Sequence, residues 1–82
     1  MKDDFVYIEH IQSSLKRIRS YTTGLNRELF LENHMVQDAI VRQLEIIGEA
    51  TKKISLDFRN QHKNIPWKDM AAMRDKLMGI FN

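Results

Sequence analysis

The sequence predicts an all-α fold, a small antiparallel helical bundle with one long central helix. Apolar residues recur at spacings of three and four along most of the chain, which is the periodicity of amphipathic helices. Strand-type alternation is absent, and the 82 residues include only three glycines and one proline. Because a chain of this length forms one domain, residues 1–82 are expected to fold as a single unit.

The first two helices are predicted near the N-terminus. The first runs from about Asp3 or Asp4 to Tyr21, and Gly24 is expected to stop it in the left-handed conformation. Asn26 has the side chain of an N-cap, which predicts a short second helix over residues 27–32. The apolar stripe of the first helix consists of Phe5, Ile8, Ile11, Leu15 and Ile18.

The central helix is predicted from about His34 or Met35 to Phe58 or Asn60. Two adjacent apolar stripes give it a wide buried face, so it should pack on more than one side. Gly48 lies inside this helix, where glycine is unfavourable, and it predicts a close crossing by another helix. The stripes are Val36, Ile40, Leu44, Ile47, Ile54 and Phe58, and beside them Met35, Ala39, Ile46 and Ala50.

A last helix is predicted to open near Pro66, which is tolerated in a first turn, and to end at Gly79. Trp67 is expected to anchor it in the core or at a dimer contact. Arg74 falls on the apolar side of this helix, so it must pair, extend to solvent or serve a site. Glu45 or Glu49 on the central helix is a candidate structural partner, and the alternative is a functional role for Arg74.

Composition limits the classes of function. The 13 basic and 11 acidic side chains give a net charge of +2, which permits contact with RNA without requiring it. There is no cysteine, which fits a cytoplasmic protein and excludes disulfides and thiolate metal sites. No run reaches the roughly 18 apolar residues of a membrane span, and the N-terminus lacks the pattern of a signal peptide. A chain of 82 residues buries a small core and has no disulfide to stabilise it. Burial of further surface in a homodimer or a higher oligomer is therefore favoured.

Arg42, Glu45 and Glu49 share one face of the central helix by their spacing. One interpretation is a solvated face with weak salt bridges to Lys52 and Lys53, and the other is a polar patch in a cleft. Neither glutamate has a helical histidine three residues away, as di-iron bundles require. The three histidines lie in different segments, so no metal site and no cofactor are predicted.

Two segments carry a resemblance to a known family. Residues 44–50, Leu-Glu-Ile-Ile-Gly-Glu-Ala, resemble a signature of the HepT-like branch of the HEPN superfamily, also called the domain of unknown function 86 family. Residues 65–77 resemble that family's Pro-Trp-x-x-(Ile/Met)-x-x-Met-Arg-(Asp/Asn)-x-Leu pattern, in which Arg74 corresponds to the motif arginine and Asp75 to the polar residue after it. The resemblance covers nearly the whole chain.

This resemblance implies a HEPN helical bundle that forms homodimers and cleaves RNA without a metal, at a cleft between two protomers. It implies a toxin whose partner is a minimal nucleotidyltransferase antitoxin of the MntA type. Arg74 would stabilise charge on the phosphorane. Arg42, Glu45 and Glu49 would line the cleft.

The family motif continues to a histidine and a tyrosine, at positions that hold Gly79 and Phe81 here. The histidine would move protons during cleavage. We therefore expect a chain truncated before the catalytic half of its motif, with weak or no ribonuclease activity. The alternative is a helical dimerisation or antitoxin-binding module without catalysis. The shortened end would leave Ile46, Ala50, Trp67 and Leu77 as candidate contacts between protomers.

Overall fold

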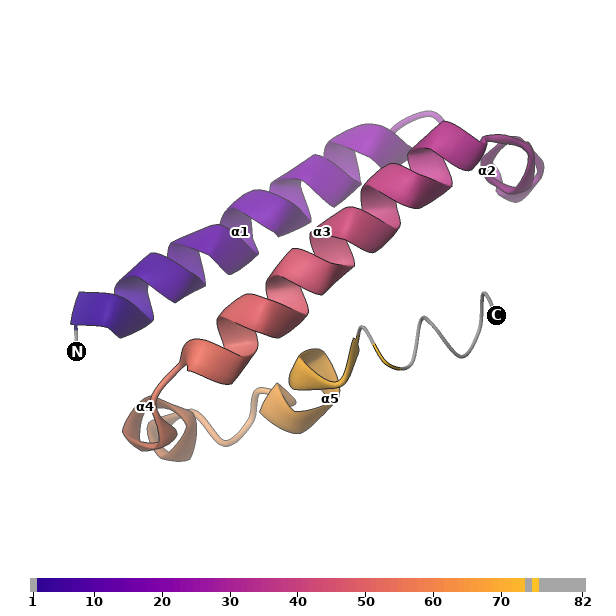
Figure 1. Ribbon diagram of the computed structural model, residues 1–82. Helices are drawn as coiled ribbons and strands as arrows, with labels where there is room; N and C mark the ends of the chain where they lie inside the picture. Colours follow the sequence, from indigo (N-terminus) through magenta and orange to yellow (C-terminus); the bar gives the residue numbers. More distant parts are fainter. Residues whose placement is uncertain (1, 74, 76–82) are drawn as a thin grey trace.

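The computed structural model describes residues 2–73 and 75, and within them it contains helices and no strand. The helices are α1 (Lys2–Thr22), α2 (Arg27–Glu32), α3 (His34–Lys53), α4 (Leu56–Gln61) and α5 (Trp67–Ala71). Figure 1 shows α1 and α3 as two long neighbouring helices, with α5 against α3 on the side away from α1. The predicted all-α class and the long central helix are confirmed.

The predicted turn at Gly24 and the predicted cap at Asn26 are confirmed, and a second asparagine caps the start of α3. Gly24 has φ = 78° after α1, a conformation that costs glycine little. Asn26 caps α2 by accepting a hydrogen bond from the Leu29 amide at 2.8 Å. Asn33 caps α3 in the same way, accepting from the Val36 amide at 3.0 Å. These caps satisfy amide groups that the first turn of a helix leaves without partners.

The central helix ends earlier than predicted, at Lys53 rather than Phe58 or Asn60. Ile54 and Ser55 adopt extended backbone, and the Ser55 hydroxyl accepts a hydrogen bond from the Phe58 amide, which starts α4. The side chain of Asp4 reinforces this break, because its two oxygens accept from the Ser55 amide and hydroxyl, each at 2.7 Å. These two bonds lower the pKa of Asp4. The apolar periodicity of residues 54–58 predicted a continuous helix there. It gave no sign of the contact between Ser55 and Asp4, which are 51 positions apart.

The core lies along α3, where α1 packs on one side and α5 on the other. Its buried apolar side chains are Ile11, Ile47, Ala50, Ile54 and Trp67. The predicted stripe of α1 is partly wrong, because Phe5 is 63% exposed and Leu15 is 49% exposed. Asp4 and Ser14 are buried instead, so α1 is rotated relative to the expected stripe. The bond from Asp4 to Ser55 fixes this rotation, which apolar spacing alone does not show.

The predicted last helix is described only in part. Pro66 is the N-cap residue of α5, which runs to Ala71, and the predicted end at Gly79 lies outside the described residues. Met73 and Asp75 are helical again. The rest of the predicted helix, Arg74 and residues 76–82, lies outside the described residues. In the described part of the chain, no helix combines the length and the apolar character that crossing a membrane requires.

Candidate functional site

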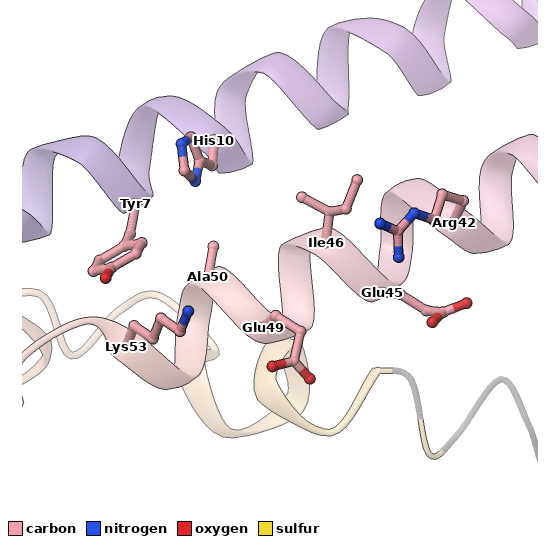
Figure 2. A pocket seen from close by; sticks show the side chains of 8 residues that line it. All are labelled: Tyr7, His10, Arg42, Glu45, Ile46, Glu49, Ala50 and Lys53. Carbon is pink, nitrogen blue, oxygen red and sulfur yellow. The ribbon is translucent and has the colours of Figure 1, made fainter.

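A groove of about 230 Å³ lies between α1 and α3. We call it the mixed-charge groove, and Figure 2 shows side chains from both helices around it. It brings together the three polar residues that the sequence indicated. Its lining consists of Tyr7 and His10 from α1, and of Arg42, Glu45, Ile46, Glu49, Ala50 and Lys53 from α3.

The α3 side of the groove carries charges of both signs. Arg42 and Glu49 are exposed, whereas Glu45 is half-buried. Glu49 lies 3.9 Å from the ammonium group of Lys52, and both side chains are at least half exposed. An exposed pair of this kind stabilises a protein by only about 0.2–1 kcal/mol. The predicted salt bridge to Lys52 is thus present.

The α1 side contributes two rings that the sequence reasoning did not place here. The Tyr7 and His10 rings are 6.0 Å apart and nearly perpendicular. The Lys53 ammonium group lies 5.7 Å from the centre of the Tyr7 ring, within the range of a cation–π contact. Lys53 therefore contacts α1 instead of pairing within its own helix. The three-residue spacing of Tyr7 and His10 was the signal for their shared face.

The groove offers imidazole, phenol and carboxylate groups beside two cations. These groups can donate or accept protons and can offset charge on a phosphate. Among the residues that the structure describes, no three histidine, aspartate or glutamate side chains are grouped so as to hold a metal ion. The chemistry available from the described groups is acid–base and electrostatic.

Comparison with known families gives a match to Ribonuclease HepT-like over residues 11–80. The chain belongs to the HepT-like ribonuclease family. The match spans α2 to α5 and most of α1, including the α3 side of the mixed-charge groove. The resemblance noted in residues 44–50 and 65–77 is thereby confirmed.

Curated relatives of this HepT-like chain carry ribonuclease names. A protein of Thermococcus cleftensis named "Probable ribonuclease HepT" is 46% identical over 92% of this chain and 68% of its own length. One of Caldanaerobacter subterraneus named "Putative RNase" is 41% identical over 95% of this chain and 70% of its own. A Methanocaldococcus jannaschii protein named "Gamma-glutamylcyclotransferase and putative RNase" is 42% identical over 94% of this chain.

The chain spans 35% of the length of that last relative. The comparison with solved structures gave no significant match. Family membership therefore comes from the sequence comparisons, and the helical arrangement comes from the structure.

Of the two motif residues Arg74 and Asp75, the structure describes only Asp75. Arg74 lies outside the described residues, and Asp75 is helical and exposed. Their assignment as catalytic residues stays a prediction, as does the pairing of Arg74 with Glu45 or Glu49.

The residues suggested as contacts between protomers differ in exposure. Ala50 and Trp67 are buried in the chain's own core, which confirms Trp67 as a core anchor. Ile46 is half-buried beside the mixed-charge groove. Leu77 lies outside the described residues. Ile46 is therefore the most accessible described candidate of the four.

Proposed function

We propose that this chain is a metal-independent endoribonuclease of the HepT type, with weak activity in this form. Support comes from family membership over residues 11–80, which covers the Met-Arg-Asp segment of the motif. Arg74 is proposed to stabilise negative charge on the phosphorane, and Asp75 to assist it. Arginine suits the charge role because its guanidinium stays ionised and can bind phosphate through two hydrogen bonds.

The proposal of weak activity rests on two positions in the sequence. Gly79 and Phe81 stand where the family motif has histidine and tyrosine. Glycine and phenylalanine have no group that transfers protons near neutral pH. Loss of a general acid–base group typically lowers a rate by about 10²–10⁴-fold.

The mixed-charge groove is proposed to line the RNA cleft with Arg42, Glu45 and Glu49. Its cations would hold the phosphate backbone, and its carboxylates would limit how tightly the backbone binds. The proposed assembly is a homodimer or higher oligomer. The proposed partner is a minimal nucleotidyltransferase antitoxin of the MntA type, in a toxin–antitoxin pair of the cytoplasm.

Cleavage of a labelled RNA in EDTA tests the proposal. We compare the chain with Arg74→Ala and with the double variant Gly79→His, Phe81→Tyr. We expect slow cleavage that Arg74→Ala abolishes and that the double variant accelerates. Unchanged cleavage by Arg74→Ala would contradict the assigned role of this arginine.

A second function is a helical dimerisation or antitoxin-binding module without catalysis. The observation that favours it is the same pair of positions, Gly79 and Phe81. It predicts no cleavage by the chain or by Arg74→Ala, together with stable binding to the antitoxin in gel filtration.

A further inference from the structure

A second and larger groove, of about 720 Å³, lies between α4, α5 and the loop that joins them. Arg59, Lys63 and Lys68 line it, against one carboxylate, Asp69. We call it the basic groove. Its formal charge of +2 equals the net charge of the whole chain, so the other charges of the sequence cancel. The basic groove therefore carries an excess of positive charge on a nearly neutral protein.

Among the described residues, the cations of the basic groove outnumber its carboxylate three to one. Within the described part of the chain, none of Arg59, Lys63 and Lys68 forms an ion pair. Lys63 and Lys68 are exposed, and Arg59 is half-buried. The Arg59 Nη2 donates to the Thr51 carbonyl at 2.6 Å, which holds the guanidinium in place without changing its charge. Three unpaired cations in one hollow attract an anion.

The backbone that carries these cations, from α4 through the loop to α5, is held by local contacts. The Trp67 indole N–H donates to the His62 carbonyl at 2.9 Å, and the Ile65 amide donates to the same carbonyl at 3.1 Å. The Phe58 ring lies 4.5 Å from the His62 ring and 6.0 Å from the Trp67 ring, between centres. The loop between α4 and α5 is thereby tied at both ends. A fixed frame loses little conformational freedom when a ligand binds.

The groove also offers apolar surface beside its charges. Leu56, at 71% exposure, and Pro66 lie among the lining residues. A chain with regularly spaced phosphates and flat bases fits such a surface, because its backbone meets the cations and its bases meet the apolar groups. In the sequence, the lining residue Ala71 precedes Arg74 by three positions.

We propose that the basic groove binds the phosphate backbone of single-stranded RNA. It would act as a surface that holds the substrate, and this inference rests on the proposed ribonuclease function. An acidic peptide is negatively charged like RNA and is therefore the competing candidate ligand. RNA is favoured because the chain belongs to a ribonuclease family.

The test measures the affinity of the 82-residue chain for a fluorescein-labelled single-stranded RNA, by anisotropy in EDTA at several salt concentrations. The test variant is Lys63→Gln, Lys68→Gln, and both of its lysines are exposed. The matched control is Lys16→Gln, Arg17→Gln, which removes two exposed cations from α1. Circular dichroism confirms that each variant is folded, and each single lysine substitution serves as a second test.

Each phosphate contact with a single strand contributes about 0.7 to the slope of log affinity against log salt. We therefore expect the test variant to bind RNA roughly 25-fold more weakly at 0.1 M salt, with a slope smaller by about 1.4. The control should keep the affinity and slope of the starting chain. Each single substitution should give about half of the change in slope.

Three outcomes overturn the inference. They are no RNA binding by the chain, equal losses in the test and control variants, or a loss of affinity for a labelled oligo-glutamate with RNA binding unchanged. The result is separable from the cleavage assay. Groove-dependent binding without any cleavage would leave the inference standing and remove the proposed function, whereas cleavage with groove-independent binding would do the reverse.

Discussion

The two grooves of this protein differ in how their charges are balanced. The mixed-charge groove has Arg42 and Lys53 beside Glu45 and Glu49, and Lys53 is further engaged by the Tyr7 ring. The basic groove has three cations and one carboxylate. Charges of opposite sign in one groove lower its net potential, whereas an excess of one sign attracts a ligand of the other sign. Our proposal therefore expects tight RNA binding at the basic groove and weaker contact at the mixed-charge groove.

The largest expected effect comes from removing the side chain that supports the basic groove. Trp67 is 7% exposed and packs in the core, so Trp67→Ala should destabilise the fold by about 3–5 kcal/mol. Total stability for a chain of this size is only about 4–12 kcal/mol. Urea denaturation followed by circular dichroism measures the loss. Trp67→Phe, which keeps most of the packing and loses the bond to His62, should cost much less.

RNA affinity tests the difference between the two grooves directly. Arg42→Gln, Lys53→Gln removes two cations from the mixed-charge groove, as Lys63→Gln, Lys68→Gln does from the basic groove. We expect the first pair to weaken RNA binding less than threefold and the second by roughly 25-fold. The reason is that Glu45 and Glu49 line the same groove as the first pair and lower its positive potential. Equal losses in anisotropy measurements would show that the two grooves share the binding.

The two hydrogen bonds that Ser55 donates to Asp4 should contribute stability that depends on pH. Because the pKa of Asp4 is lowered in the folded protein, its contribution is present above the ordinary value of 3.8. This stability is lost as the pH falls below 3.8 and through the lowered pKa of Asp4 in the folded protein. Asp4→Asn should lower the melting temperature at pH 7 and reduce its loss on acidification. The control is Asp3→Asn, since Asp3 is exposed and should show neither change.

The smallest expected effect lies in the mixed-charge groove. Glu49→Gln removes the exposed pair with Lys52, and we expect a loss of only about 0.2–1 kcal/mol in urea denaturation. RNA binding should strengthen slightly, because a carboxylate is removed near the proposed cleft. A large loss of stability would mean that Glu49 is held by more than this pair.

Local chemistry made much of the fold predictable. The caps at Asn26 and Asn33 and the turn at Gly24 depend on side chains within three residues, so short segments of sequence were sufficient. The break after Lys53 was missed, although Ser55 is a good N-cap residue. Apolar spacing continues through Ile54 and Phe58, and this periodicity predicts an unbroken helix there. The deciding contact comes from Asp4, far away in the sequence.

The candidate site was predictable on one helix only. The spacing of Arg42, Glu45 and Glu49 placed them on one face of α3, and in the structure all three line the mixed-charge groove. Their place in a cleft between two protomers stays a prediction. Tyr7 and His10 were missed because their approach depends on how α1 is rotated against α3. The basic groove was missed for a similar reason. Its cations lie on α4, the loop and α5, and no single helical period relates them.

By itself, the sequence determined the helical class, the first caps, the family and the shared face of the polar residues on α3. These features depend on neighbours in the chain or on matched residues. The tertiary structure alone decided the rotation of α1, the end of α3 and the gathering of Arg59, Lys63 and Lys68. Each of these depends on contacts between segments, such as Asp4 with Ser55 and Trp67 with His62, whose geometry exists only when the helices pack.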